Sequence, residues 1–157
     1  MSLRITSAET ADDLARIREL FREYQDFLGV DLCFQGFEEE LAGLPGRYAP
    51  PTGALLLAMD GEETVGCVAV REIEPGVCEM KRLFVRPSYR GQGLGRRLAE
   101  AIIAAARRIG YRTMRLDTLE QLREAIGLYE SLGFRRISPY YANPLPGVIY
   151  WELRLKA

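Results

Sequence analysis

Apolar positions along the chain follow two different spacings, one typical of helices and one typical of strands. In segment 11–27 the apolar residues recur every three or four positions: Leu14, Ile17, Leu20, Phe21, Tyr24 and Phe27. This spacing places them on one face of an amphipathic helix. The same spacing predicts helices over residues 37–44, 94–109 and 121–132, the long one ending at Gly110.

Runs rich in aliphatic and β-branched residues separate these helices. Segments 54–59 and 64–72 are joined through Asp60-Gly61, a dipeptide suited to the positive φ angles of a tight hairpin turn. Further strands are expected at residues 3–5, 77–85, 111–117, 134–137 and 148–155. Mostly antiparallel strands with helices before, between and after them predict one α/β (α+β) domain over residues 1–157. Its mixed sheet of about seven strands is expected to carry helices on both faces.

The composition is that of an ordinary globular domain. Apolar residues make up 48% and charged residues 27% of the 157 residues, and the formal net charge is −1. This balance argues against a general nucleic-acid-binding protein. The chain has neither a signal-like start nor an apolar stretch of about 18 residues. We therefore expect a cytoplasmic protein with no nucleic-acid and no membrane partner.

The absence of histidine restricts the chemistry. It excludes Ser-His-Asp and Cys-His nucleophile systems and histidine-ligated metals. The three cysteines, Cys33, Cys67 and Cys78, match neither zinc-site nor disulfide spacings, so we expect buried free thiols and no metal. Any catalytic base must be a carboxylate, a tyrosine, a lysine or a thiol.

The segment "RPSYRGQGLGRRL", residues 86–98, places three glycines among arginines between a strand and a helix. A dinucleotide fingerprint would need glycine at Arg96, and a P-loop would need a Lys-Ser/Thr pair that is missing. The remaining interpretation is a glycine-lined helix start whose free amides favour an anion such as pyrophosphate. Arg90, Arg96 and Arg97 would add charge-assisted hydrogen bonds. The alternative is a glycine-rich turn with solvated arginines.

Residues 90–95, "RGQGLG", match the R/Q-x-x-G-x-G/A signature for acyl-coenzyme A, and the chain resembles the GNAT family of N-acetyltransferases. "EMKRLFVRPSYRGQGLGRRL" is similar to the family's fourth strand, pyrophosphate turn and third helix, and "AIGLYESLGF" to its late helix and following strand. The resemblance implies a GNAT-like fold and acetyl-CoA as the acyl donor. It implies these coenzyme-binding residues: Leu83, Phe84, Val85, Arg90, Gly91, Gln92, Gly93, Leu94, Gly95 and Arg96.

The resemblance also implies where the acetyl group lies and which group acts as the acid. The pantetheine arm would follow residues 83–85, and the thioester would point between this strand and segment 111–117, two neighbours that splay apart in the family. The amide of Leu83 would meet the carbonyl oxygen. Tyr129, four residues before Gly133, occupies the place of the family's thiolate-protonating tyrosine; the alternative is a tyrosine that fills an apolar helix face. Leu122 stands where many relatives carry an asparagine that bonds the pantetheine.

Glu79 is the candidate base, because several family members carry a glutamate base eleven residues before the position of Arg90. Partial burial is expected to raise the pKa of Glu79 toward a useful range. Strand alternation predicts one shared face for four residues: Glu79, Lys81, Leu83 and Val85. The alternative is a structural ion pair of Glu79 with Lys81 or Arg71, in which case Glu72 or a water chain would serve as base.

Six residues are expected to shape the acceptor side: Tyr24, Phe34, Gln35, Tyr140, Tyr141 and Asn143. The acidic run 38–40 would suit a cationic acceptor but is more typical of a solvated helix face. The expected function is acetyl transfer to a primary amine of a small molecule or peptide. A non-catalytic acyl-CoA-binding module and an unrelated anion-binding protein are the alternatives. The resemblance also suggests a homodimer.

Overall fold

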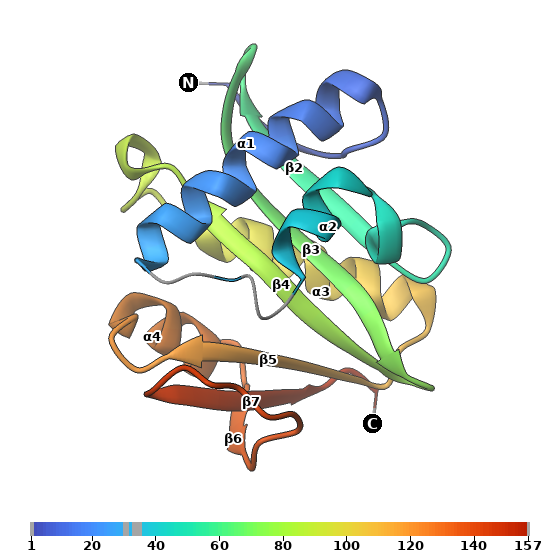
Figure 1. Cartoon of the computed structure of the whole chain (residues 1–157), viewed down its shortest axis with the longest axis vertical. Helices are drawn as coiled ribbons and strands as arrows, with labels where there is room; N and C mark the ends of the chain where they lie inside the picture. The colour runs from blue at the N-terminus through green and yellow to red at the C-terminus, as the bar shows by residue number, and fades with distance from the viewer. Residues whose placement is uncertain (1, 30–31, 33–35, 157) are drawn as a thin grey trace.

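The computed structural model describes residues 2–29, 32 and 36–156. A seven-stranded sheet forms the centre of this part of the chain, in the order β1-β2-β3-β4-β5-β7-β6 (Figure 1). Neighbouring strands are antiparallel except β4 and β5, which are parallel. The expected mixed, mostly antiparallel sheet is therefore confirmed. The strands are β1 (Leu3–Ser7), β2 (Ala54–Asp60), β3 (Glu63–Glu74), β4 (Val77–Val85), β5 (Thr113–Leu119), β6 (Arg135–Ile137) and β7 (Val148–Arg154).

Helices cover both faces of the sheet, as expected. Helices α1 (Ala11–Leu28) and α2 (Phe37–Ala42) lie on one face, and α3 (Leu94–Ile109) lies on the other (Figure 1). Helix α4 (Arg123–Ser131) follows β5 and contributes to the same apolar core as α3. Short 3₁₀ turns stand at η2 (Gly46–Tyr48) and η3 (Pro87–Tyr89). None of these helices is long and apolar enough to span a membrane in the described part of the chain.

Two apolar cores hold the layers together. Residues such as Ile17, Phe21 and Phe37 pack between α1, α2 and the sheet, and all three are at most 1% exposed. Leu98 and Ile102 of α3, each 0% exposed, belong to the core on the opposite face. Burial of apolar surface on both faces fixes the middle strands, so β4, which carries the predicted site residues, runs through the centre of the molecule.

An extra residue in β4 interrupts its pairing with β3. Cys67 pairs with Phe84, but Ala69, two residues along β3, pairs with Lys81, three residues back along β4. At this β-bulge Arg82 adopts a φ angle of +62°, an unusual conformation for a residue with a side chain. A bulge of this kind reverses which face the following side chains occupy.

The predicted shared face of Glu79, Lys81, Leu83 and Val85 is wrong for this reason. Leu83 and Val85, after the bulge, pack against the α3 core together with Cys78 and Met80, which precede it; Phe84 instead packs in the α1 core. Simple alternation from Cys78 and Met80 then leaves Glu79 and Lys81 on the α1–α2 face. The bulge therefore places Leu83 and Val85 on the opposite face of the sheet from Glu79 and Lys81.

Strands β4 and β5 pair only near their first residues. The register comprises Val77 with Thr113, Cys78 with Met114 and Glu79 with Arg115. Beyond Glu79 the two strands diverge (Figure 1). The backbone of β4 from Met80 onward therefore has an edge without a β5 partner, and this edge lies next to the bulge.

Candidate active site

The turn before α3 presents free backbone amides. Gly91 and Gly93 both have a φ angle of +79°, a left-handed conformation that glycine adopts at little cost. Helix α3 begins after Gly93 without a side-chain cap, and the first helical bond runs from the amide of Arg97 to the carbonyl of Gly93. In the described part of the chain no group accepts a hydrogen bond from the amides of residues 91–96. This is the unsatisfied donor set that an anion at a helix N-terminus requires.

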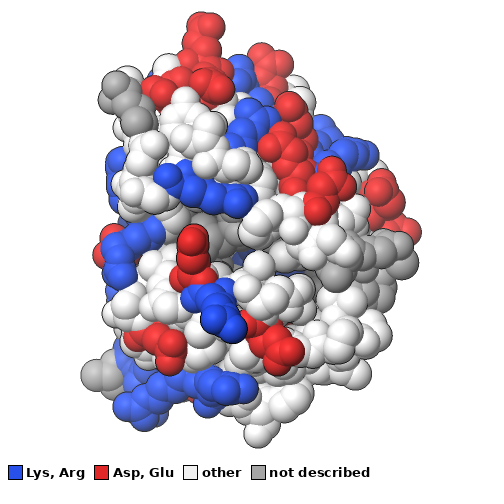
Figure 2. Space-filling view, turned by 90° about the vertical axis from the view of Figure 1, so that its left-hand side faces the viewer, with Lys and Arg blue, Asp and Glu red and all other residues white. Residues whose placement is uncertain are grey.

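The arginines around this turn contact other parts of the protein. The Nε of Arg90 donates to the carbonyl of Val85 at 2.9 Å, and its guanidinium lies 4.3 Å from the ring centroid of Phe27. Arg96 donates to the hydroxyl of Ser131 on α4. Positive and negative side chains are interspersed on the face that carries this turn and α4 (Figure 2). The amides, more than the arginine side chains, are thus poised for a ligand.

A small cavity of about 40 Å³ lies in the opening between β4 and β5, and we call it the inner cavity. Leu83 lines it, whereas Phe84 and Val85, also predicted to contact coenzyme, do not contribute to its wall. Tyr24, a predicted acceptor-side residue, lines it too. Leu122, at the position where relatives carry asparagine, is also part of the wall, so the inner cavity meets an apolar side chain there.

Tyr129 extends from α4 to the inner cavity. It is 7% exposed, and its ring meets that of Phe134 edge-on at 5.6 Å. Its hydroxyl has no hydrogen-bonding partner in the part of the chain that the structure describes. Burial raises the pKa of Tyr129 above its usual value, and the neighbouring Tyr24 and Asp117 add to this. The phenol therefore remains protonated at neutral pH, as a proton donor must be.

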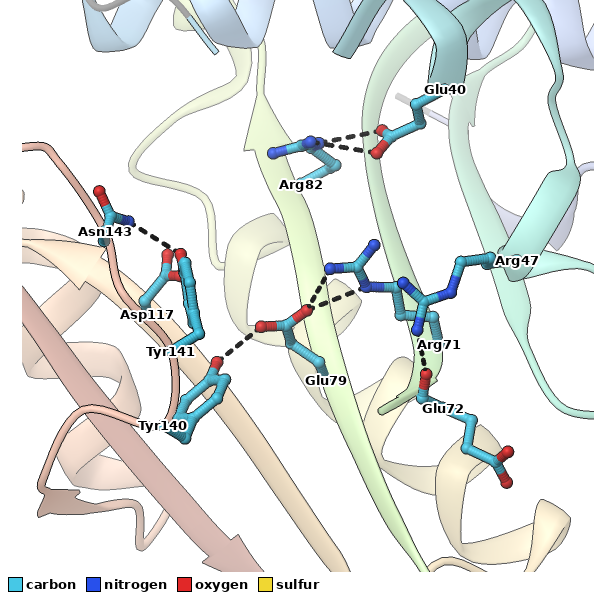
Figure 3. Close-up of polar contacts among 10 residues, drawn as sticks. All are labelled: Glu40, Arg47, Arg71, Glu72, Glu79, Arg82, Asp117, Tyr140, Tyr141 and Asn143. Atoms are coloured by element: carbon cyan, nitrogen blue, oxygen red, sulfur yellow. Dashed lines mark hydrogen bonds and ion pairs between the residues drawn. The ribbon is translucent and has the colours of Figure 1, made fainter. Parts of the chain in front are cut away.

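A second, larger cavity of about 320 Å³ lies beside Glu79, and we call it the outer cavity. Glu79 is 2% exposed. Its Oε1 accepts from Arg71 Nε at 3.0 Å and lies 2.9 Å from Arg71 Nη2, while its Oε2 accepts from the Tyr140 hydroxyl at 2.7 Å (Figure 3). Burial acts to raise the pKa of Glu79, but the charges of Lys81 and Arg71 and the hydrogen bonds outweigh it, so its pKa is lowered. The expected rise in this pKa is wrong, because the carboxylate is paired.

Glu72 lies on the other side of the sheet from Glu79. In the β3–β4 register Glu72 pairs with Cys78, while Arg71 pairs with Glu79, and side chains of paired residues share a face. The carboxylate of Glu72 points away from that of Glu79 (Figure 3). It therefore cannot replace Glu79 as base in the outer cavity.

The loop before β7 places three of the predicted acceptor-side residues next to the site. Besides the bond from Tyr140 to Glu79, the Tyr141 hydroxyl donates to Asp117, and the amide of Asn143 donates to the Tyr141 oxygen at 2.8 Å (Figure 3). This network ties the loop to β4 and β5 at the point where they separate. Phe34 and Gln35, the other predicted acceptor-side residues, lie outside the described residues, as does Cys33.

The acidic run at the start of α2 divides into two kinds of carboxylate. Glu40 forms a two-pronged ion pair with the buried Arg82, with both N–O distances at 3.1 Å (Figure 3). Glu38 is 71% exposed and lies 3.8 Å from Arg22. Glu40 therefore anchors α2 to the β4 bulge, and its carboxylate is already paired and not available to a cationic acceptor.

Lys81, Asp117 and Arg115 line the cavities but were not identified as functional residues from the sequence. Lys81 lines both cavities, Asp117 the inner and Arg115 the outer. Burial, with the charge of Arg82, lowers the pKa of Lys81 to about 8. The available signal was the presence of charged residues within otherwise apolar strands. Cys67 and Cys78 are buried free thiols, as expected.

Comparisons with known proteins bear on the family of the chain. A model of the acetyltransferase (GNAT) family matches residues 14–134. An uncharacterized N-acetyltransferase from Schizosaccharomyces pombe is 44% identical over 156 residues, which cover 98% of this chain and 96% of that protein.

Two solved structures share the fold. An acetyltransferase from Streptococcus agalactiae gives a TM-score of 0.82 at 24% identity, covering 98% of this chain and 99% of that one. YncA from Salmonella typhimurium, determined with its cofactor acetyl-CoA, gives a TM-score of 0.76 at 22% identity and covers 99% of this chain and 95% of that one. These two likenesses concern the fold, while the family match and the yeast relative identify the family. The chain belongs to the GNAT family and is an N-acetyltransferase.

Proposed function

We propose that the protein transfers an acetyl group from acetyl-CoA directly to a primary amine of a small molecule or peptide. The observation that carries this proposal is the opening between β4 and β5, which holds the inner cavity. The turn with the free amides of residues 91–96 follows the end of β4 along the chain. Lys81 lines both cavities, so a donor in one and an acceptor in the other would meet at this side chain. An acceptor-sized cavity beside Glu79 favours an enzyme over a non-catalytic acyl-CoA-binding module.

Acetyl-CoA fits the features of the donor side. The amides of residues 91–96 match the need of a pyrophosphate for several donors at a helix N-terminus, and the unpaired edge of β4 suits an extended pantetheine amide chain. We assign coenzyme binding to Leu83, Phe84, Val85, Arg90, Gly91, Gln92, Gly93, Leu94, Gly95 and Arg96. Leu83 lines the inner cavity, which supports its amide as the donor to the thioester carbonyl oxygen.

Acetyl transfer requires two proton movements in this site. The amine nitrogen attacks the carbonyl carbon, the C–S bond breaks, and Tyr129 gives its proton to the departing thiolate. Glu79 takes the proton lost by the amine. Because Oε2 of Glu79 already accepts from the Tyr140 hydroxyl, we propose that the amine proton reaches Glu79 through Tyr140. The hydroxyl gives its own proton to the carboxylate as it receives the proton of the amine.

A coenzyme A release assay with a panel of primary amines tests this function. The purified protein is incubated with acetyl-CoA and each amine, and free thiol is measured against a reaction without amine. Calorimetric titrations with acetyl-CoA, ATP and NAD run in parallel. We expect binding of acetyl-CoA alone and amine-dependent thiol release. Equal binding of all three ligands, or thiol release that no amine increases, would refute the proposal.

A further inference from the structure

The outer cavity has more cationic than anionic side chains in its wall. Arg71, Lys81 and Arg115 line it together with the carboxylates of Glu74 and Glu79. The wall therefore carries an excess of one positive charge, although Arg71 is paired with Glu79 and Arg115 with Glu74 and Glu152. A second positive charge on the acceptor, as in a polyamine, would be repelled there.

The carboxylates are already occupied by protein groups. Both oxygens of Glu79 accept hydrogen bonds from within the protein, and its side chain is only 2% exposed. Glu74 lies 3.7 Å from Arg115 and is 55% exposed at the rim. Neither carboxylate therefore offers a buried, unoccupied oxygen to a cationic group of a ligand.

The guanidinium groups of Arg71 and Arg115, in contrast, have N–H donors that no protein group uses among the described residues. Arg71 uses Nε and Nη2 on Glu79, and Arg115 uses Nε on Glu152 at 2.9 Å. In the described part of the chain Nη1 of Arg71 and Nη2 of Arg115 have no hydrogen-bonding partner. The side chains of Arg71 and Arg115 are 22% and 23% exposed. The wall can therefore donate hydrogen bonds to a ligand from free N–H groups of partly buried arginines. Such groups bind a carboxylate well.

The size and walls of the outer cavity restrict the ligand further. A volume of about 320 Å³ stands at the small end of the range for small-molecule sites. The rings of Tyr140 and Tyr141 contribute an aromatic wall, and Arg115 is held 5.5 Å from the Tyr140 ring centroid. This wall orients Arg115 and leaves room for a compact ligand.

We infer that the acceptor is a primary amine of about amino-acid size that carries a carboxylate, and that Arg115 and Arg71 bind this carboxylate in the outer cavity. The inference rests on the proposed function, since the amine must reach the thioester past Lys81. The acceptor carboxylate is a binding group and takes no part in bond making. In an amino acid the carboxylate and the amine lie on one carbon, so the arginines also set the direction in which the nitrogen points.

Matched pairs of acceptors provide the test. Thiol release is measured with a set of amino acids, with the carboxamide of each, and with a polyamine. A carboxamide keeps the size of the acid and has a less basic amine, which is more often neutral. A higher kcat/KM for the acid therefore reports carboxylate binding and not amine reactivity. We expect the acids to exceed their carboxamides by about 10- to 100-fold, the range for loss of a charge-assisted bond.

An arginine substitution tests the assignment to the cavity. Arg115→Gln should raise the KM of the acids by about 10-fold or more and that of the carboxamides by much less. Arg154→Gln, at an exposed arginine on the neighbouring β7, is the matched control and should change neither. Thermal melting verifies that both variants are folded.

The outcomes separate this inference from the proposed function. Thiol release that is equal for acids, carboxamides and polyamine, or insensitive to Arg115→Gln, overturns the carboxylate site and retains the acetyltransferase. If no amine releases coenzyme A, the same acids are titrated calorimetrically into protein that contains coenzyme A. Binding of the acids but not the carboxamides then retains the site without the reaction, and equal or absent binding overturns both.

Discussion

Tyr129 presents a hydroxyl to the inner cavity that bonds to no other described residue. Tyr129→Phe should therefore leave the fold and the affinity for acetyl-CoA unchanged, because the ring stays in place against Phe134. It should lower kcat by about 10²- to 10⁴-fold, the usual contribution of a positioned acid. Steady-state kinetics and calorimetric titration of acetyl-CoA measure the two effects.

Tyr111 offers the matched control for this substitution. It is 4% exposed, and its hydroxyl donates to the carbonyl of Thr52 at 2.5 Å, away from both cavities. Tyr111→Phe should lower the free energy of unfolding by about 1 kcal/mol and leave kcat as it is. An unchanged kcat in Tyr129→Phe would remove Tyr129 as the acid.

Lys81 should give the stability of the protein a dependence on pH in the alkaline range. Burial lowers its pKa in the folded protein to about 8, below the ordinary value of 10.5. Between these values the unfolded chain binds a proton that the folded chain has lost, so the free energy of unfolding should rise with pH by roughly 1–3 kcal/mol. Lys81→Met should flatten this rise, as urea denaturation at pH 7.5, 9 and 10 would show. An identical slope in both proteins would contradict the assignment.

Single residues were predictable from the sequence where a motif or a strand fixed them. Tyr129 lines the inner cavity and Glu79 the outer cavity, while their roles as acid and base stay predictions. The pairing of Glu79 was not predictable, since the bond from Tyr140 joins residues 61 positions apart. The hydrogen bonds and charges from such distant partners decide the direction of a pKa, which explains the wrong expectation for Glu79.

At the scale of elements, the ion pair of Glu40 and Arg82 joins α2 to the β4 bulge. Arg82 is 3% exposed and Glu40 13% exposed. Glu40→Gln should lower the free energy of unfolding by about 3 kcal/mol, because it removes the carboxylate charge that pairs with a buried guanidinium. Glu38→Gln, on the same helix but exposed, should cost less than about 0.5 kcal/mol. Urea denaturation of both variants tests this, and equal losses would deny the anchoring role of Glu40.

Alanine substitutions at two glycines near the start of α3 should have different effects. Gly93 has a φ angle of +79°, so Gly93→Ala should cost about 1–2 kcal/mol of stability and weaken acetyl-CoA binding by disturbing the amides. Gly95 has no such φ angle, and an added Cβ would lie 3.9 Å from Val85. Gly95→Ala should change stability by less than about 1 kcal/mol and preserve binding. Thermal melting and titration measure both, and equal effects of the two changes would contradict the proposed geometry.

The helices and strands could be predicted from the spacing of apolar residues, but the bulge in β4 could not. The expected strand at residues 77–85 is β4, and the helix expected at 94–109 is α3. Ends shifted by a few residues elsewhere, as in β5, which was expected at 111–117 and spans Thr113–Leu119. The bulge at Arg82 has no local sequence signal such as glycine. Strict alternation was therefore assumed past the bulge, where it fails for Leu83 and Val85.

At the scale of the whole molecule, the gap between β4 and β5 connects the donor side of the site with the acceptor side. The turn before α3 stands on the donor side, and the loop with Tyr140 and Tyr141 borders the outer cavity. Coarse topology was predictable, because turns and periodicity give the order of elements. The cavities were not, because they depend on how two strands diverge. A homodimer and a cytoplasmic location stay predictions.

Hydrogen exchange of the backbone amides of residues 91–96, followed by NMR with and without an excess of acetyl-CoA, tests the central claim most directly. These amides have no acceptor in the described chain, so they should exchange quickly in the free protein. If they hold the pyrophosphate, acetyl-CoA should slow their exchange at least tenfold, since an engaged amide is protected. Exchange rates that acetyl-CoA leaves unchanged at these six residues would contradict the account.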